Sequence, residues 1–296
     1  MPVLHLSPLP DRGVLSITGP DSRNFLQGLI SNDIHLVTPE NAIYAALLTP
    51  QGKYLYDFFI SQAGDRLLVD CEKERMADLA KRLRMYKLRA DAAIADATEQ
   101  YTISALWGDS AASTVGLAAQ AGAAMETAGG TLYVDPRLAT AGLRAVFDVD
   151  QSGPALATFT PTPATTDAYD IHRLKLGLPD ASRDLVPEKS VLLESGFDDL
   201  NGINWEKGCY MGQELTARTK YRGLAKKRLT AVTIEGEMPT PGAAVMCGDK
   251  TAGEMRSSRG GFGLALLRLD HLQDPAGELT SENSTLRAVK PDWARF

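Results

Sequence analysis

The sequence predicts an α+β protein that ends in a small β-module. Three observations carry this prediction: apolar and polar residues alternate at 13–19, apolar residues recur at helical spacing within 73–86, and short glycine-broken strands follow residue 223. The chain has 296 residues, so it is longer than one average domain and long enough to bury a large core.

The first part of the chain alternates strands with helices. The strand at 13–19 is followed by a helix that Asp21 or Ser22 caps, and the stretches 42–49 and 53–61 flank a hairpin turn. Each predicted helix buries one face, which is formed in the first by Phe25, Leu26, Leu29 and Ile30, and in the second by Met76, Leu79, Leu83 and Tyr86.

The middle of the chain is less regular. An alanine-rich stretch at 109–130 predicts a weakly packing helix, and 131–135 with 143–149 predicts a pair of strands. The Pro/Thr/Ala-rich stretch 153–166 is typical of a linker, and 167–178 predicts a helix that glycine and proline end.

Cysteine usage and hydropathy indicate a cytoplasmic protein. The three cysteines are odd in number and widely spaced, which excludes a disulfide framework and favours a reducing compartment. The four histidines are scattered, so we expect no metal site built by this chain alone. No signal peptide and no membrane-spanning run is predicted.

The formal net charge is −6, yet basic residues gather in two places. Five occur at 81–89, where a solvated helix face is the favoured interpretation. Seven occur at 207–228 against one glutamate, where they surround a cysteine and favour an anionic ligand. Nucleic acid is an unlikely ligand, because it would fit a basic chain better than an acidic one.

The stretch KGCYMGQE at 207–214 is the most informative. Gly208 and Gly212 bracket Cys209, and Lys207 precedes it. The helical pattern that follows would place the thiol at a helix N-terminus, and both features lower a thiol pKa. The residues leave two interpretations open: a reactive or ligating thiol, or a small buried residue in a tight turn. One thiolate is too few for an iron–sulfur cluster unless a partner supplies the other ligands.

KGCYMGQE followed by ARTKYRG at 217–223 resembles the signature of the YgfZ-type folate-binding proteins. These are relatives of the glycine cleavage T-protein and include mitochondrial iron–sulfur assembly factors of the same type. Three further stretches support the resemblance: SITGPDSRNFLQGLISNDI at 16–34, DPRLATAGLRA at 135–145 and LKLGLP at 174–179.

The resemblance implies ferredoxin-like α+β parts around a central, folate-binding cavity, followed by a C-terminal β-barrel. The implied division is an α+β folate-binding part at 1–92, a second α+β part at 93–165, a return to the folate-binding body at 166–223 and the barrel at 224–296. The implied cofactor is tetrahydrofolate. The implied role is assembly or repair of 4Fe–4S enzymes, with Cys209 as the functional residue and assembly proteins or client enzymes as partners.

The resemblance also suggests folate contacts, each with a structural alternative. Tyr169 matches an aromatic position near the folate, or is an ordinary helix residue. Arg144, or Arg137, would meet a carboxylate or form an ion pair. Trp205 would line the cavity or belong to the core. The remaining candidates are Asn32 and Asp33, which could instead cap a helix, and Arg218 with Lys220 and Arg222 for the folate tail or a partner.

Departures from the T-protein put its chemistry in doubt. Where that enzyme has paired aspartates, this chain has Tyr56 and Asp57. Side chains alternate along a strand, so only one of the two can face the pocket, and a solvent-facing strand residue is one interpretation of Asp57. We therefore expect no aminomethyltransferase activity. Two other functions stay open: a folate-dependent aminomethyl or demethylating transferase, which needs a carboxylate at this place, and an RNA-binding accessory protein that uses 207–228.

Overall fold

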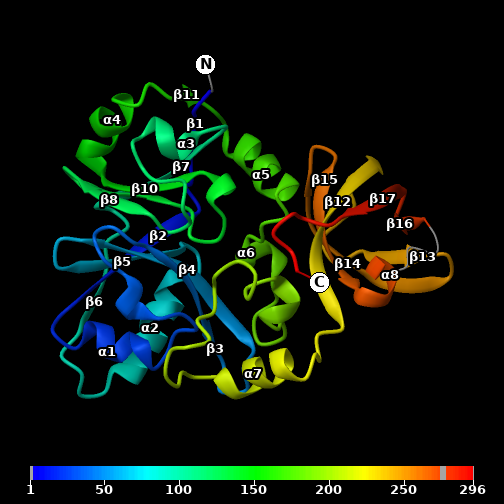
Figure 1. The fold of residues 1–296 in the computed structure, drawn as a ribbon, viewed down its shortest axis with the longest axis horizontal. Helices are drawn as coiled ribbons and strands as arrows, with labels where there is room; N and C mark the ends of the chain where they lie inside the picture. Colours follow the sequence, from blue (N-terminus) through cyan, green and yellow to red (C-terminus); the bar gives the residue numbers. More distant parts are fainter. Residues whose placement is uncertain (1–2, 274–277, 296) are drawn as a thin grey trace. The chain divides into compact units, whose positions relative to one another are not determined.

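The computed structural model describes residues 3–273 and 278–295, which form two compact units (Figure 1). Unit 1 comprises the residues up to 48 together with 56–169 and 200–211. Unit 2 comprises 49–55, 170–199 and the chain from 212 onward. The four-part division expected from the sequence stays a prediction.

Unit 1 contains a five-stranded sheet in the order β3-β4-β5-β2-β6. Its strands are β2 (Arg12–Thr18), β3 (Ile43–Leu48), β4 (Tyr54–Ala63), β5 (Arg66–Glu72) and β6 (Ala93–Asp96). All six residues of β3 are buried, which explains why its sequence is continuously apolar. Helices α1 (Ser22–Gln27) and α2 (Met76–Lys87) and the short 3-10 turn η1 (Ile34–Leu36) connect the strands.

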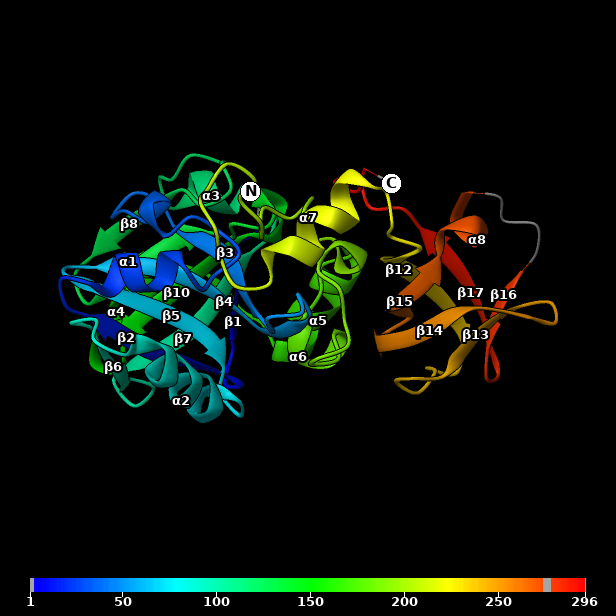
Figure 2. The same cartoon turned by 90° about the horizontal axis from the view of Figure 1, so that it is seen from below.

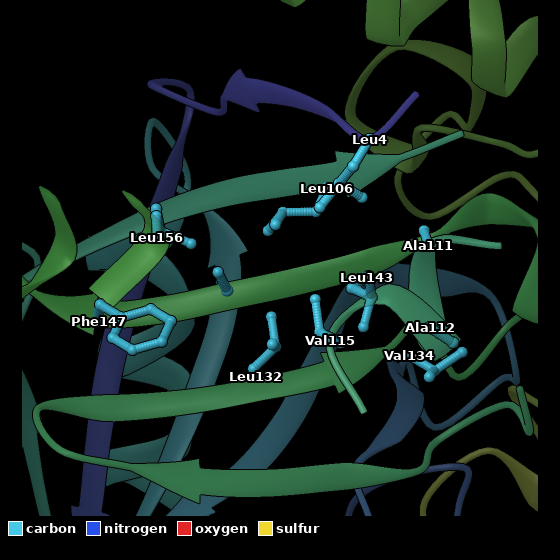
Figure 3. Packing of buried hydrophobic residues seen from close by; sticks show 11 residues of the cluster. Leu4, Leu106, Ala111, Ala112, Val115, Leu132, Val134, Leu143, Phe147 and Leu156 are labelled. Atoms are coloured by element: carbon cyan, nitrogen blue, oxygen red, sulfur yellow. The ribbon is translucent and has the colours of Figure 1, made fainter. Parts of the chain in front are cut away.

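A six-stranded sheet completes unit 1, in the order β11-β1-β7-β10-β9-β8. Its strands are β1 (His5–Pro8), β7 (Tyr101–Trp107), β8 (Ala124–Thr127), β9 (Gly130–Val134), β10 (Leu143–Asp148) and β11 (Thr162–Pro163). The predicted pair β9 and β10 is antiparallel, with Tyr133 opposite Arg144. Figure 3 shows the apolar cluster on this sheet, in which Leu106, Leu132 and Phe147 lie close together.

Two predictions for the middle of the chain are wrong. In place of a helix over 109–130 the structure has only α3 (Ala111–Thr114), a loop and β8. Gly116 and Gly122 adopt positive φ there, which a continuous helix does not allow. In place of a linker from 153, α4 (Val149–Ala157) continues through Pro154, because Leu156 packs into the cluster of Figure 3.

The first two helices also differ in detail from expectation. α1 ends at Gln27, so Leu29 and Ile30 are buried in the loop that follows it. In α2, Met76, Leu79 and Leu83 are buried as predicted, whereas Tyr86 is 40% exposed.

Unit 2 contains a closed six-stranded barrel in the order β12-β15-β14-β13-β16-β17, visible in Figures 1 and 2. Its strands are β12 (Lys227–Gly236), β13 (Ala244–Cys247), β14 (Lys250–Arg259), β15 (Phe262–Arg268), β16 (Leu279–Ser281) and β17 (Ser284–Val289), with α8 (Leu269–Gln273) between β15 and β16. The barrel interior is apolar and includes Val245, Met255 and Leu267. The predicted α+β class with a C-terminal barrel is confirmed.

Short helices precede the barrel: α5 (Thr166–Lys175), whose first four residues belong to unit 1, α6 (Ala181–Asp184), η3 (Leu193–Ser195) and α7 (Gln213–Tyr221). Within unit 2, Arg173 joins α5 to α6, because it pairs with Asp170 at 2.7 Å and Asp184 at 2.6 Å. Over residues 3–273 and 278–295, no helix is both long and apolar enough to cross a membrane.

Candidate functional site

The segment 200–211, which we call the signature loop, has little regular structure but is hydrogen-bonded to the segment that follows α1. Asn204 N donates to Ser31 O at 3.0 Å, and Met211 N donates to Gly28 O at 3.1 Å. Ser31 Oγ donates to Gly202 O at 2.6 Å. Both segments belong to unit 1, and these bonds fix the loop along its whole length.

Lys207 is the central anchor of the signature loop. Its ammonium donates to the backbone carbonyls of Gln27 and Ile30 at 2.7 Å and of Asn32 at 2.9 Å. The residue is 8% exposed, and burial lowers the pKa of its side chain to about 8, although Asp33 acts in the opposite direction. An ammonium has three N–H donors, and these bonds use all three. Lys207 therefore holds the backbone, instead of pairing with a thiolate as the sequence suggested.

Cys209 lies two residues beyond this anchor and is exposed. α7 begins only at Gln213, after Gly212 in the left-handed region with φ 81°, so Cys209 does not belong to the first turn of a helix. The macrodipole of a helix acts only within about its first turn. The stabilisation of a thiolate by α7 that the sequence predicted is therefore weak. By contrast, Cys71 is buried in β5, and burial raises its pKa to about 12.

A pocket of about 430 Å³ lies in unit 1 next to the signature loop. Five amide side chains are among its lining residues, and they come from three parts of the chain: Asn32 and Asn41, Gln120, and Asn201 and Asn204. The rest of the lining is apolar or aromatic and consists of Leu36, Ala42, Ile43, Tyr44, Ala121, Pro136 and Ile203. Its volume is in the usual range for small-molecule sites, and its lining is uncharged.

Asn32 connects this pocket to the signature loop. Its amide Nδ2 donates to Tyr44 O and to Asn201 O, both at 2.8 Å, and its Oδ1 accepts from Asp33 N at 2.8 Å. Asp33 caps η1 by accepting a hydrogen bond from His35 N at 3.0 Å. Asp33 is therefore a helix cap, which is the structural alternative suggested for it. Asn32 both links the two segments and lines the pocket.

Arg144 lies in a different setting, in a buried group with Arg12 and Asp70. Its Nε donates to Asp70 Oδ2 at 2.7 Å, and Arg12 Nε donates to Asp70 Oδ1 at 2.7 Å. Arg144 is 3% exposed and its guanidinium lies 4.1 Å from the ring centroid of Phe59. Asp70 also raises the pKa of Arg144, although burial opposes this. The ion pair connects β10 to β5, and thus the two sheets of unit 1.

Among the other candidates, Arg137 is brought close to Arg144, because both guanidiniums lie over the Phe59 ring, at 4.9 Å and 4.1 Å from its centroid. Tyr169 is 8% exposed, and its ring centroid lies 6.5 Å from that of Trp107. Arg137 forms a buried pair with Asp135 at 2.7 Å. Trp205 is half-buried in the signature loop, and Arg218 is exposed on α7 in unit 2. Contacts of any of these residues with folate stay predictions.

The structure separates Tyr56 from Asp57. Side chains alternate along β4, so the two residues point to opposite faces of the sheet. Tyr56 bonds to Asp78 on α2, and Asp57 Oδ2 accepts a hydrogen bond from Tyr44 Oη at 2.9 Å. The solvent-facing alternative for Asp57 is excluded, because the residue is 7% exposed and is bonded to the buried Tyr44.

Sequence reasoning missed Asp70 and most of the amide residues around the pocket. No local signal marks Asn41, Gln120 or Asn201, because they belong to separate segments that only the fold brings to one cavity. Asp70 lies between apolar residues in the middle of β5, and a carboxylate at such a position indicates a buried ion pair.

Family models match two parts of the chain. The GCVT N-terminal domain matches residues 11–128, and the CAF17 C-terminal beta-barrel domain matches residues 226–296. Among solved structures, the glycine cleavage system aminomethyltransferase T from Bartonella henselae is similar, with a TM-score of 0.78 over 97% of this chain and 85% of that chain, at 14% identity. The chain is thus a GCVT-type protein with a CAF17-type barrel.

Curated relatives define the family more narrowly. The mitochondrial iron–sulfur cluster assembly factor IBA57 of Mus musculus is 34% identical over 96% of this chain and 84% of the relative, and the values for the Homo sapiens protein are the same. A homologue from Neurospora crassa is 32% identical over 80% of this chain and 55% of the relative. The chain belongs to the IBA57 family of iron–sulfur cluster assembly factors.

These relatives refine two predictions. The expected kinship with the T-protein and with iron–sulfur assembly factors is confirmed, but the family is a close relative of YgfZ and not YgfZ itself. The cytoplasmic location is contradicted, because the relatives are named as mitochondrial proteins. Sparse cysteines indicate a reducing environment, and that property does not distinguish the cytosol from other reducing compartments.

Proposed function

We propose that this protein assists iron–sulfur cluster assembly by presenting Cys209 to a partner protein on a fixed loop. The observation that carries the proposal is the contrast between an exposed thiol and a fully used, buried anchor two residues before it. A fixed loop keeps the thiol accessible while the backbone around it stays in one conformation. A ligand or nucleophile needs both properties.

The partner has to supply the remaining ligands of any shared cluster. An iron–sulfur cluster needs several thiolates, and Cys209 provides one. Across residues 3–273 and 278–295, there is no group of three or more His, Cys, Asp or Glu side chains placed to hold a metal. The curated relatives are named as assembly factors, which supports assembly proteins or client enzymes as partners.

The test compares two cysteine variants in a strain that lacks the protein. We expect Cys209→Ser to fold normally and to fail to restore 4Fe–4S enzyme activity. Cys247→Ser is the matched control and should restore it, because Cys247 lies half-buried in a barrel strand. Full rescue by Cys209→Ser would end the proposal, whereas failure of both variants would show that the loss is not specific to this thiol.

The second part of the proposal is that the protein binds tetrahydrofolate. The amide-lined pocket fits the pterin ring of this molecule. A pterin ring needs a flat slot with several hydrogen-bond donors and acceptors, and amide side chains offer both. Asn204 and Gln120 are the side chains we assign to the pterin. The glutamyl carboxylates find no cation among these lining residues and would extend beyond them. Bound tetrahydrofolate would supply a carrier of one-carbon units.

Calorimetry with tetrahydrofolate discriminates between two places for the ring. Gln120→Leu removes an amide and keeps the side-chain size, so we expect affinity to fall about tenfold if the pocket is the site. Tyr169→Ala should have that effect if the ring lies beside Trp107. Unchanged affinity in both variants would remove both placements, and absent binding by the wild type would remove folate from the proposal.

One observation favours a folate-dependent transferase as the second candidate. Asp57 is buried and bonded to Tyr44, a residue of the pocket lining, so a carboxylate lies near the proposed folate site. We still expect binding without turnover, that is, no ammonia release from an aminomethylated carrier protein. Activity within about tenfold of a true T-protein, lost in Asp57→Asn, would make the transferase the leading function.

A further inference from the structure

The C-terminal end of α2 displays a group of apolar side chains. Leu88 is 87% exposed, Met85 is 66% exposed and Tyr86 is 40% exposed. All three lie within one turn at the end of α2, which lies on the surface of unit 1 in Figures 1 and 2. Met85 and Leu88 are three residues apart, a spacing that makes side chains neighbours on a helix, whereas Tyr86 follows Met85 directly and points to another side. Single exposed apolar residues are common, but a grouped set of this size indicates an interaction site.

Leu88 is costly to the folded protein in two independent ways. It is the residue that ends α2, and its φ of 47° with ψ of −105° lies in a region that favours glycine. Its side chain also buries almost no apolar surface on folding, because it remains nearly fully exposed. A glycine would relieve the backbone strain and a polar residue would relieve the exposure, so stability does not account for a leucine here.

Cations surround the apolar patch. Residues 81–89 contain Lys81, Arg82, Arg84, Lys87 and Arg89 and no acidic residue. Arg82 pairs with Asp78, and Arg84 donates to Ile94 O at 2.8 Å. Lys81 and Arg89 are exposed. The nearest carboxylates along the chain are Asp78, which also bonds to Tyr56, and the exposed Asp91.

We propose that the end of α2, with Leu88 and Met85 inserted and Lys81 and Arg89 beside the headgroups, docks reversibly on an anionic phospholipid surface. Long cationic side chains flanking protruding apolar ones suit the boundary between headgroups and acyl chains. The net charge of −6 works against binding to any anionic surface, so attraction depends on a local group of cations such as this one.

Sedimentation with vesicles tests this proposal. Wild type should bind vesicles of equal phosphatidylglycerol and phosphatidylcholine at least tenfold more strongly than pure phosphatidylcholine, and added salt should weaken the binding. Lys81→Glu with Arg89→Glu should lower binding about tenfold or more. The matched control is Lys250→Glu with Arg287→Glu, which changes two exposed cations of unit 2 that lie outside both basic stretches and should leave binding unchanged.

Leu88→Gly gives a second readout that a purely structural role would not produce. We expect it to weaken vesicle binding several-fold while keeping or raising the melting temperature, because glycine tolerates the positive φ. Three results would overturn the proposal: no preference of wild type for the anionic vesicles, equal loss in the control pair, or unchanged binding by Leu88→Gly. Stronger binding to a single-stranded RNA of about 20 nucleotides than to vesicles would also overturn it, in favour of a nucleic-acid surface.

Discussion

β5 and the signature loop each combine a thiol with a charged side chain, and they use burial differently. In β5, Asp70 and Cys71 are both 1% exposed, and the carboxylate pairs with two arginines. In the signature loop, Lys207 is buried while Cys209 is exposed. The difference teaches that a buried charge can serve the structure in both places, and that the two segments differ in the exposure of the neighbouring thiol.

Alkylation gives the largest expected difference between the two regions. At pH 8 a thiol with a pKa of about 12 is ionised in about one molecule in ten thousand, and Cys71 is also closed to reagents by burial. We expect iodoacetamide to modify Cys209 in the native protein at least about a thousandfold faster than Cys71, as measured by mass spectrometry of peptides. Comparable rates would show that the two regions do not differ as described. Denatured protein is the control, in which both should react.

Breaking the charge group of β5 should have the next largest effect. Asp70→Asn leaves Arg12 and Arg144 buried without their carboxylate, which we expect to lower the free energy of unfolding by about 3–5 kcal/mol. Urea denaturation measures this change. Asp270→Asn is the matched control, because the Asp270–Arg268 pair is exposed and should contribute nothing measurable. A stable Asp70→Asn protein would mean that the two arginines are solvated or have other acceptors.

Lys207→Met tests whether the signature loop depends on its anchor. Three backbone carbonyls lose their donor, while the cost of burying a charge also disappears, so we expect a net loss of about 2 kcal/mol. Hydrogen exchange should rise locally at 200–211 and at 28–32. Lys226→Met, at an exposed position, should change neither quantity. An unchanged exchange pattern in Lys207→Met would show that the remaining loop hydrogen bonds suffice.

The smallest expected effect is a pH dependence of stability that belongs to Lys207. Its folded pKa of about 8 lies below the ordinary value of 10.5, so the folded protein releases this proton first as pH rises. The unfolded chain then binds more protons, and stability rises through this window, by about 1 kcal/mol between about pH 7.5 and 9. We expect wild type to show this gain relative to Lys207→Met. A constant difference between the two proteins over this range would contradict the lowered pKa.

The sequence by itself determined the α+β class, the C-terminal barrel and the family signature around Cys209. These features are local: strand and helix periodicity, glycine-broken strands and an unbroken motif are readable within short windows. The prediction from sequence is wrong at 109–130, because glycines with positive φ interrupt the helix that the alanine content suggested. It is also wrong at 153–157, because the packing of Leu156 keeps a helix where Pro154 suggested a linker.

Only the tertiary structure decided what the candidate residues do. Lys207 and Arg144 are both cations near suggestive motifs, yet one binds carbonyls of the segment after α1 and the other binds a carboxylate on β5. Asp57 is buried because Tyr44 reaches it from β3, and the pocket exists because amides from three distant segments meet. Partners far apart in sequence set burial, hydrogen bonding and pKa, and no local pattern records them.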